Sequence, residues 1–592
     1  MAEWMKAKVR PLRNSINLTF FLLDTASMLI IVIGLIQLSL DLFLLMYIIY
    51  SLIAFMVLIL GTITLFVIFR KNEYKLKLLR RAKFRSFLLI PVMFGIFSIV
   101  CIIGKQYMLA VCMGIILVGF LVAYTILPRI NRGYPRLQRT FLALGIFLII
   151  APFGFFVRGQ LPPRLASQVW TMHEIDNQGF LFPNGLDPAD VNKDGYDDYV
   201  TNYEWDGVIR VEFHPGLANV KEPWPAITIG FASNTESSGF GDFDGDGNFD
   251  VVVAHGIEIF GFVQFPVISG VCFIWGPNPA SCMDPSAWQM SEDIPGTIDN
   301  GHFLYIRGQE VNGDGALDII VGGRGLNPRA GLKWIEAPIN QTDRRNVSKW
   351  QVHNIDASLE SGHGFSFADI DQDGDFDISL CNSDWDTLEE EEEIIWYENP
   401  GTGVPAQENP WPKHLLYRSN EFYSKGQVTL ANLTADNYPE ILIFTETHLL
   451  IFKNPQNPQV NDSWDIIRIP KNPATCWLTR PIKVVDLNND SKPEILGMLT
   501  HREDALPTNK AAIFLMEYSG TDPTSPSANW TTHVIKWGEG MLGVSANGEK
   551  WDQVVFEDID RDGDLDIVAN CEECHTLGFV FIAVVWFENP LV

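Results

Sequence analysis

Five apolar stretches in the first 160 residues are each long enough to cross a bilayer as a helix. They cover roughly residues 15–38, 43–69, 86–104, 108–127 and 140–157. After residue 160 the apolar runs are short, rich in β-branched and aromatic residues, and separated by turn residues, which is typical of strands. The pattern predicts an all-α bundle of about five transmembrane spans over residues 1–160, followed by an all-β domain over residues 161–592.

Basic residues flank these stretches unevenly. They gather before the first stretch, between the second and third, and between the fourth and fifth. Because loops rich in Lys and Arg stay in the cytoplasm, we expect a cytoplasmic N-terminus, and an odd number of spans puts the β domain outside the cell. The sequence thus predicts a multi-pass plasma membrane protein that contacts membrane lipid through residues 1–160. Asp24, inside the first stretch, is either a functional intramembrane carboxylate or a hydrogen-bonding group between helices.

Charge divides the chain at the same place. Residues 1–160 hold 18 of the 43 basic residues and four of the 71 acidic ones, so they carry a formal charge of +14 and the remainder −42. An acidic β domain excludes nucleic acid as its partner, because binding phosphates requires positive charge. Clustered carboxylates suit metal cations instead.

A nine-residue pattern recurs seven times in the acidic domain. It reads acid-x-(Asp/Asn)-x-Asp-Gly-x-x-Asp and leads into an apolar run. Five close copies begin at Asp190, Asp242, Glu310, Asp369 and Asp558, and two weaker copies begin at Asn432 and Asp486. A Trp-led strand precedes each copy, and an aromatic strand that ends in Pro or a polar turn follows it. Each unit is thus about four short strands, so we predict a seven-bladed β-propeller.

The two ends of this domain are each incomplete. It opens with a Trp-led strand, Trp170–Ile175, that no blade precedes, and it ends at Val592 without such a strand. Pairing the first strand into the last blade would close the ring and remove its exposed edges. Four Trp-led strands continue as W-x-x-H, and we expect these histidines to pack or hydrogen-bond between blades. They are His173, His353, His414 and His533.

Each copy of the pattern gathers oxygen donors in a tight loop. Carboxylates occupy positions 1, 3, 5 and 9, Gly at position 6 allows the turn, and position 7 can add its backbone carbonyl. Oxygen ligands alone favour Ca²⁺ over zinc, copper or Mg²⁺. We therefore expect about five Ca²⁺ sites and a weaker sixth at Asp486, with the copy at Asn432 empty or weakly occupied; the alternative is a set of acidic turns without metal.

The predicted metal ligands fall into six loops. They are Asp190, Asn192, Asp194, Tyr196 and Asp198; Asp242, Asp244, Asp246, Asn248 and Asp250; Glu310, Asn312, Asp314, Ala316 and Asp318; Asp369, Asp371, Asp373, Asp375 and Asp377; Asp486, Asn488, Asp490 and Glu494; and Asp558, Asp560, Asp562, Asp564 and Asp566.

The segment GFGDFDGDGNFD, Gly239–Asp250, resembles the FG-GAP/VCBS repeat family. That family includes the head propeller of integrin α subunits and many microbial surface and secreted proteins. The resemblance covers about residues 165–592 and implies calcium in strand–loop–strand sites on one face of the propeller and ligand recognition on the opposite face. The copies at Asn432 and Asp486 depart from the family pattern. The five predicted spans are unlike the single span of an integrin, so integrin function is not expected.

Loops on the face away from the metals should bring His, Arg, Lys and acidic residues around the propeller mouth. They form either a ligand-binding or catalytic pocket or merely polar loop tips. The candidate ligand-binding residues are His302, His363, Arg324, Lys425, Arg480 and Glu572, and the same loops carry Asp552, Glu204, His255, Asp384, Glu446 and His501.

Two pairs of cysteines stand close together in the sequence. Cys571-Glu-Glu-Cys574-His575 matches the c-type haem attachment string, and the alternatives are a local disulfide or two free thiols. Cys272 and Cys282 bracket a turn and are a second candidate disulfide.

Three functions remain open. The first is a surface receptor or adhesin that binds a protein or a glycan while Ca²⁺ rigidifies its blades. The second is an ectoenzyme that acts on carbohydrate as a lyase or dehydratase, for which no catalytic residue can be assigned. The third is a structural subunit of a larger membrane assembly. A deep pocket where His302, His363 and Arg324 meet would favour the enzyme, and a flat or aromatic face would favour binding. The sequence names neither the ligand nor the oligomeric state.

Overall fold

The structure is a computed structural model that describes part of the chain. The described residues are 169–592 without 257–268, 325–329, 360–361, 383–391, 402–410, 420–426, 435, 460–463, 501–509, 526–527, 539–548, 577–578, 581 and 591–592. The chain divides into two units, Met1–Leu161 and Pro162–Val592, and every described residue belongs to the second.

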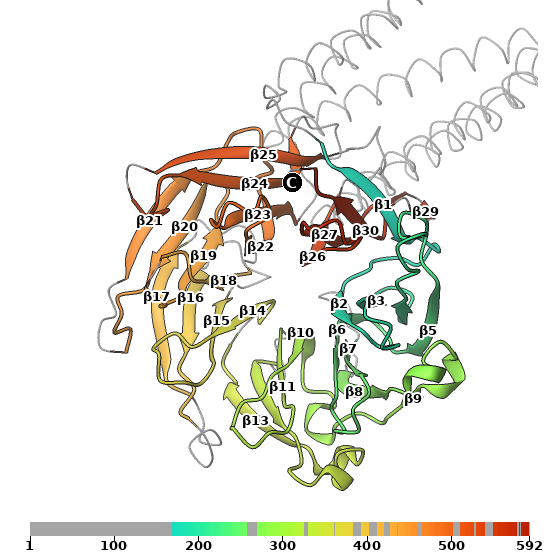
Figure 1. Ribbon diagram of the computed structural model, residues 1–592. Coiled ribbons are helices and arrows are strands. Elements are labelled where there is room, and N and C mark those ends of the chain that lie inside the picture. Colours follow the sequence, from blue (N-terminus) through green and yellow to red (C-terminus); the bar gives the residue numbers. More distant parts are fainter. Residues whose placement is uncertain are drawn as a thin grey trace, which may run out of the picture. The chain divides into compact units, whose positions relative to one another are not determined.

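Seven four-stranded antiparallel sheets form a ring in this unit, which confirms the predicted all-β, seven-bladed propeller (Figure 1). Each sheet is one blade, and blades 1 to 7 follow one another along the chain. The first strand of each blade lies nearest the centre of the ring, where it borders the central channel (Figure 1).

The strands of each blade follow one another from its inner edge to its outer edge. Blade 1 consists of β2 (Asp187–Ala189), β3 (Asp198–Tyr203), β4 (Val208–Glu212) and β5 (Ala226–Phe231). Blade 2 consists of β6 (Thr235–Gly241), β7 (Asp250–Gly256), β8 (Ser269–Trp275) and β9 (Gln289–Met290). Blade 3 consists of β10 (His302–Gly308), β11 (Ile319–Arg324), β12 (Leu332–Glu336) and β13 (Gln351–Asp356). Blade 4 consists of β14 (Phe365–Ala368), β15 (Asp377–Asn382), β16 (Glu392–Tyr397) and β17 (Lys413–Ser419).

The remaining blades have the same plan. Blade 5 consists of β18 (Thr429–Ala431), β19 (Glu440–Phe444), β20 (His448–Lys453) and β21 (Asp465–Pro470). Blade 6 consists of β22 (Thr479–Val485), β23 (Glu494–Leu499), β24 (Ala511–Ser519) and β25 (Asn529–Trp537). Blade 7 consists of β26 (Trp551–Glu557), β27 (Asp566–Cys571), β30 (Val584–Glu588) and β1 (Thr171–Asp176). A small hairpin pairs β28 (His575–Thr576) with β29 (Phe579–Val580), and five 3₁₀ helices occupy loops: η1 (Pro279–Ser281), η2 (Pro285–Ala287), η3 (Pro295–Thr297), η4 (Gln341–Asp343) and η5 (Val347–Lys349).

The two middle strands of a blade are packed on both faces. Every residue of β7 and β8 is buried, whereas outer strand β17 alternates between exposed and partly buried residues. Neighbouring blades share their cores, since one apolar cluster joins Val200 and Ile209 of blade 1 to Val253 and Ile274 of blade 2. Short unbroken runs of β-branched residues are what such doubly covered strands require.

The ring is closed by strands from opposite ends of the unit. Strand β1 pairs with β30 in antiparallel register, from Thr171 opposite Glu588 to Asp176 opposite Val584. It thereby supplies the outer strand of blade 7, where Figure 1 shows it beside β30. The backbone N–H of Trp170 also donates to the carbonyl of Ile535 in blade 6, at 3.1 Å. This pairing leaves no blade of the ring without its fourth strand.

The W-x-x-H histidines contact the neighbouring strand of their own blade instead of another blade. His173 stacks on Trp586 with ring centroids 4.5 Å apart, and its Nε2 lies 2.8 Å from a carboxylate oxygen of Glu588. His353 and His414 repeat this arrangement on Trp334 and Trp396. Because the outer strand pairs in antiparallel register, each of these histidines lies opposite a residue of the third strand. Their contacts hold the outer strand to the rest of its blade.

The transmembrane part of the predicted fold class is wrong for the part of the chain that the structure describes. A spanning helix needs about 20 apolar residues, and no described helix is long and apolar enough to cross a membrane. The five predicted spans and Asp24 all fall outside the described residues. The predicted multi-pass plasma membrane localisation, with lipid contacts through residues 1–160, depended on those spans and is corrected by the same finding.

The loop between the inner and second strands of every blade carries the nine-residue pattern, and we call it the acid loop. The seven inner strands run in the same direction around the channel, so all acid loops lie on one face of the ring, the acid-loop face. The starts of the inner strands and the ends of the second strands meet at the opposite end of the channel, which we call the mouth.

Side chains at the end of the third strand connect blades 1, 4, 5 and 7 to the blade before them. The Nδ2 atoms of Asn399, Asn454 and Asn589 donate to the carbonyls of Val311, Ile370 and Leu487, at distances of 2.9 to 3.2 Å. Each carbonyl belongs to position 2 of the preceding acid loop. His214 makes the equivalent contact from blade 1 to Ile559 of blade 7, at 3.1 Å. The Asn-Pro turns of the sequence thus mark a repeated link between blades.

We expect Asn589→Ala to lower the free energy of unfolding by about 1–3 kcal/mol, because it leaves the buried carbonyls of Leu487 and Leu565 without a donor. Urea denaturation of the full-length chain would measure this loss. Asn278→Ala is the control, since Asn278 is exposed and caps only η1. Equal losses in the two variants would contradict a special role for the link.

Candidate functional site

The backbone of each acid loop is coiled around its own acidic side chains. In blade 1 the Asp190 carboxylate accepts hydrogen bonds from the N–H groups of Asp194 and Gly195, at 2.9 and 3.0 Å. The side-chain oxygen of Asn192 accepts from Asp194 N–H, and Asp194 accepts from Tyr196 N–H. Such side-chain-to-backbone turns are what Asp and Asn favour, and they point the remaining oxygens of positions 1, 3 and 5 toward the loop interior.

The Gly at position 6 is required by the backbone. Gly195, Gly247 and Gly374 have φ angles of 89°, 86° and 104°, a region that other residues adopt at a cost. Blade 6 has Ser491 at this position with φ 67°, and blade 5 has Asn437 with φ 68°. These two loops therefore keep the same turn without Gly.

The acid at position 9 ties three backbone segments together. In all seven blades its carboxylate accepts the N–H of position 2, as Asp250 accepts from Phe243 at 3.1 Å. In five blades it also accepts the N–H that follows the third strand, as Asp250 accepts from Gly276 at 2.7 Å. The acid at position 9 is thus mainly a structural residue. Its carboxylate has further lone pairs that these hydrogen bonds do not use.

Four acid loops bring three carboxylates close enough to share a cation. The groups are Asp242, Asp244 and Asp246; Asp369, Asp371 and Asp377; Asp486, Asp490 and Glu494; and Asp558, Asp560 and Asp562, each with ligand oxygens within 4.8 Å of one another.

Several buried carboxylate oxygens in the acid loops have no hydrogen-bond partner among the described residues. They belong to Asp242, Asp314, Asp375, Asp558, Asp560 and Asp564. Unpaired buried oxygens are costly, and a hard divalent cation would satisfy them. The loops therefore fit a cation of this type, while the roles of the predicted ligands stay predictions.

Protein cations and amides also reach into these loops. Arg345 of blade 3 pairs with Asp244 at 2.5 Å and with Asp246 at 3.4 Å. Lys221 lies 3.6 Å from Asp560 and 2.9 Å from Glu588. Gln459 donates to Asp371. The acid loops thus differ in how much of their negative charge the protein itself balances.

Burial is the main cause of raised pKa values at position 9. The pKa is raised to about 7 for Asp198, Asp318 and Asp566, and to about 8 for Asp250 and Asp377. Nearby carboxylates add to this rise, whereas hydrogen bonds from backbone N–H groups oppose it. Negative charge in these loops is therefore unfavourable without a counterion.

A second cluster of charges lies at the mouth, and we call it the mouth cluster. It contains Glu204, Glu236, His302, Arg324, Arg480, Lys550, Asp552 and Glu572, from blades 1, 2, 3, 6 and 7. His363 joins it from blade 4 through a contact with Arg480. The structure thus brings together five of the six predicted ligand-binding residues, His302, His363, Arg324, Arg480 and Glu572. The sixth, Lys425, lies outside the described residues, as do Asp384 and His501.

Arg480 and Lys550 occupy the floor of the mouth cluster. Arg480 is 1% exposed, donates to Thr500 at 2.5 Å and lies 3.9 Å from Asp552. Lys550 pairs with Glu572, and burial raises the pKa of Glu572 to about 8. The buried cations and carboxylates therefore largely balance one another.

Glu204 and Glu236 form a linked pair on one side of the mouth. Asn184 Nδ2 donates to both carboxylates, at 3.1 and 3.3 Å. Burial, and then the charge of Glu236, raise the pKa of Glu204 well above its ordinary value. Glu236 also lies 3.5 Å from His302. Glu204 and Arg324 are only partly buried, so they remain open to a ligand.

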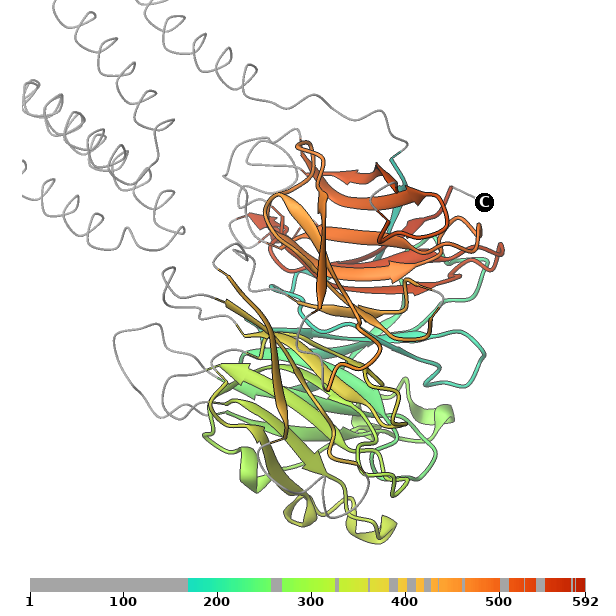
Figure 2. The ribbon, with the colours of Figure 1, turned by 90° about the vertical axis from the view of Figure 1, so that its left-hand side faces the viewer.

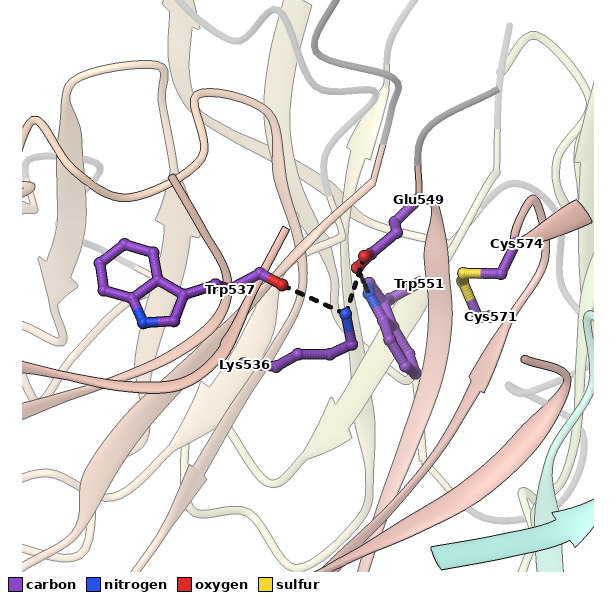
Figure 3. The surroundings of a disulfide bond; sticks show 6 residues. All are labelled: Lys536, Trp537, Glu549, Trp551, Cys571 and Cys574. Atoms are coloured by element: carbon purple, nitrogen blue, oxygen red, sulfur yellow. Dashed lines mark hydrogen bonds and ion pairs between the residues drawn. A yellow bond between two sulfur atoms is a disulfide. The ribbon is translucent and has the colours of Figure 1, made fainter. Parts of the chain in front are cut away.

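The disulfide Cys571–Cys574 closes the turn that carries Glu572. Trp551 faces Cys571 across the β26–β27 pair, and its Nε1 donates to Glu549 at 3.0 Å (Figure 3). Lys536 donates to the other oxygen of Glu549 at 2.7 Å (Figure 3). These contacts fix the backbone on both sides of Lys550. Of the alternatives for this Cys pair the disulfide is therefore the one formed, whereas Cys272 and Cys282 are free thiols and the disulfide proposed between them is wrong.

Sequence reasoning missed Glu236 and Lys550. Glu236 lies at a register shift between Thr235 and Ser237, and similar shifts occur at the mouth ends of β10, β22 and β26. A bulge changes the direction of the side chains beside it. Counting alternate residues along the strand therefore assigns these side chains to the wrong face. Among the other mouth-loop candidates, His255 pairs with Asp293 and Glu446 is exposed.

Below the mouth the channel contains a cavity of about 190 Å³ between blades 3 to 6. Tyr305, Phe365, Thr429 and Lys483 are among its lining residues. Burial lowers the pKa of Lys483 to about 8, and the nearby positive charge of Arg307 contributes to the shift. The cavity thus contains a lysine among mainly apolar lining residues, with Arg307 and Asp187 as its charged neighbours.

Comparison with known proteins assigns the chain to no family. No protein-family model matches the chain, and no curated protein sequence matches it. The resemblance to FG-GAP/VCBS repeats therefore stays a prediction.

The chain is similar to several solved structures at low identity and low TM-score. An α-L-arabinofuranosidase from Lactobacillus brevis is 12% identical over 54% of this chain and 95% of its own, with a TM-score of 0.29. An Agrocybe aegerita lectin that recognises non-reducing terminal N-acetylglucosamine is 13% identical over 62% and 83%, with a TM-score of 0.36. The PQQ domain of a pyranose dehydrogenase from Coprinopsis cinerea is 11% identical over 72% and 98%, with a TM-score of 0.36. Likeness at this level carries no conclusion about function.

Without divalent cations we expect the free energy of unfolding to fall as the pH rises from about 5 to about 7. An unfolded Asp has a pKa near 4. Over this pH range the native position-9 carboxyls therefore bind more protons than the same groups in the unfolded chain. Each such carboxyl lowers the free energy of unfolding by up to about 1.4 kcal/mol per pH unit. Urea denaturation in a chelator at several pH values measures the slope. Asp377→Asn mimics the protonated group and should flatten it; an identical slope in this variant would contradict the assignment.

Proposed function

We propose that the propeller is a recognition module that binds a glycan at its mouth while Ca²⁺ ions in the acid loops hold the blades rigid. The observation that carries the proposal is the mouth cluster, in which charged side chains from five blades meet at one end of the channel. Such a set of convergent polar groups in a concave site is typical of a ligand-binding site.

The chemistry of the mouth suits a ligand rich in hydroxyl groups. Sugar hydroxyls donate and accept hydrogen bonds, and the mouth offers acceptors such as Glu204 and donors such as Arg324 side by side. A protein partner would require a largely apolar centre with a polar rim, whereas the centre of this mouth is charged. These features support a glycan over a protein ligand.

An aromatic platform stands next to the mouth cluster. Trp205 follows Glu204 directly and is 70% exposed. Phe182 stacks on it with ring centroids 5.4 Å apart, and Phe182 holds a φ angle of 61°, which is unfavourable for an aromatic residue. Local strain of this kind concentrates at ligand sites. A flat exposed indole provides an apolar surface for a sugar ring beside hydrogen-bonding groups.

A second candidate is an enzyme that acts on carbohydrate. It is favoured by the pair of Glu204 and Glu236, which share Asn184 and of which Glu204 has a raised pKa. A carboxyl with a raised pKa beside a second carboxyl can act as a general acid. Turnover of a bound oligosaccharide distinguishes this candidate from simple binding.

Calcium is the cation that the acid loops suit best. They offer only oxygen ligands, from carboxylates at positions 1, 3 and 5, in a flexible loop, which favours Ca²⁺ over Mg²⁺ and over softer metals. Asp242, Asp244 and Asp246 would hold one ion and Asp558, Asp560 and Asp562 another. Each ion would offset the like charges that burial makes costly, and so stabilise the link between neighbouring blades.

We expect Ca²⁺ at about 100 times its dissociation constant to raise the free energy of unfolding by about 2.7 kcal/mol per independent site. Thermal unfolding of the chelated full-length chain, with and without added Ca²⁺, measures the effect. Asp373→Asn in the blade 4 loop should reduce it. The matched control is Asp436→Asn, at position 5 of the blade 5 loop, where no metal is expected; an equal reduction there, or no stabilisation by Ca²⁺ at all, would contradict the proposal.

We expect the full-length chain to retain specific glycans on an array, and Trp205→Ala to weaken the best of these interactions about tenfold, the loss of one central aromatic contact. Glu204→Gln should weaken it as well, because it replaces one of the carboxyl oxygens that the mouth offers to a ligand. Titration calorimetry with the retained glycan measures both changes. Phe376→Ala is the control, since Phe376 is 50% exposed on the acid-loop face.

Three results of this experiment are decisive. Weaker binding in Trp205→Ala with normal binding in Phe376→Ala supports glycan recognition at the mouth. Cleavage of the bound glycan supports the enzyme instead. Absence of any retained glycan, or equal affinities in the two variants, would overturn the proposed site.

A further inference from the structure

Three residues of different chemistry converge in blade 2, away from the acid loops and outside the mouth cluster. His255 lies on β7, Cys272 on β8, and Asp293 in the segment that follows β9. In the antiparallel register Val253 is opposite Cys272 and His255 is opposite Gly270. His255 and Cys272 are therefore diagonal neighbours on the same face of the sheet, close to the mouth end of the blade.

Their donor atoms are close enough to share one ion. An imidazole nitrogen, the Sγ of Cys272 and a carboxylate oxygen of Asp293 all lie within 4.8 Å of one another. His255 Nε2 is 2.8 Å from Asp293 Oδ1. The side chain of His255 is 9% exposed and that of Asp293 is 25% exposed, so the group is buried on one side and open to solvent at Asp293.

Gly270 makes room for this arrangement. A Cβ atom at this position would lie 2.6 Å from the carboxyl carbon of Asp293, which is too close for any side chain. The absence of a side chain opposite His255 is thus what allows Asp293 to approach the sheet.

One nitrogen of His255 has no role in the hydrogen bonding of the described residues. Its Nδ1 is buried and has no hydrogen-bond partner among them. The other buried thiol of this blade, Cys282, donates to the carbonyl of Pro279 at 3.1 Å, whereas Cys272 has the His255–Asp293 pair as its polar neighbour. An imidazole, a thiol and a carboxylate whose donor atoms lie this close together have the composition of a transition-metal site.

We infer that His255, Cys272 and Asp293 bind one borderline-soft divalent cation of the zinc type. Nitrogen, sulfur and oxygen donors together suit Zn²⁺ or Co²⁺ and distinguish this site from the acid loops, which offer oxygen alone. Three protein ligands leave one position of a tetrahedral ion for solvent, on the side where Asp293 is exposed. The ion would join β7, β8 and the segment before η3. This inference does not depend on the proposed glycan binding.

Cobalt spectroscopy tests the inference directly. The full-length chain is stripped with a chelator, saturated with Ca²⁺ to occupy oxygen-only sites, and then titrated with Co²⁺. Binding through Cys272 gives a thiolate-to-cobalt charge-transfer absorption, which oxygen ligands cannot produce. We expect this absorption to saturate at one Co²⁺ per chain and to disappear when Zn²⁺ displaces the cobalt.

Three variants locate the ion. Cys272→Ser should abolish the absorption, and Cys282→Ser, a matched buried thiol of the same blade, should retain it. Asp293→Asn changes a partly exposed residue and should weaken Co²⁺ binding at least about tenfold without unfolding the blade, which far-UV circular dichroism checks. Absence of the absorption in the unaltered chain, its persistence in Cys272→Ser, or unchanged affinity in Asp293→Asn would each overturn the inference.

Discussion

The buried carboxylate at position 9 of each acid loop is the constraint on which the propeller depends. In every blade it accepts the N–H of position 2, and in five blades it also accepts the N–H that follows the third strand. The residue that follows the third strand then reaches back, through Asn399, Asn454, Asn589 or His214, to the position-2 carbonyl of the preceding blade. In blades 1, 4 and 7 one acid thus positions both the loop and the link between blades. Because the hydrogen bonds are buried, losing any of them leaves an unsatisfied partner.

This constraint divides the molecule into two ends with different tasks. The acid-loop face contains the links made by Asn399, Asn454, Asn589 and His214, so these side chains are committed to structure. In the side view of Figure 2 the strands run from one face of the ring to the other. The mouth also carries links between blades, since Asn570 of blade 7 donates to the carbonyls of Asn184 and Gly185 of blade 1. Its irregular registers at β6, β10, β22 and β26 re-aim polar side chains around the channel instead of forming uniform ladders.

Local features of the sequence were sufficient to predict the blades, because the acid loop is a short-range motif: Asp and Asn at positions 1, 3 and 5 bond to the backbone two to five residues away. The outer strands and the convergence of His302, Arg324, Arg480 and Glu572 at one end also followed, once each unit was assigned to a blade. Glu236 and Lys550 could not be found in this way, since bulges and strand ends decide where they point. The free thiol of Cys272 was misassigned to a disulfide with Cys282 because spacing alone does not reveal that the His255–Asp293 pair lies beside it. The predicted spans were an inference from apolar length, and no described helix reaches that length.

The acid loops need not bind cations equally, because the protein balances their charge to different extents. Arg345 brings a guanidinium to within 2.5 Å of Asp244, so the blade 2 loop already has one positive partner. The blade 4 loop carries five aspartates, from Asp369 to Asp377, and among the described residues no Lys or Arg forms an ion pair with it. Burial and the neighbouring charges raise the pKa of Asp375 to about 7. Like charges at such short range repel unless a proton or a cation intervenes. The unbalanced charge is therefore greatest in blade 4, and the proposed divalent ion would have the most to stabilise there, whereas in blade 2 it would have to displace Arg345.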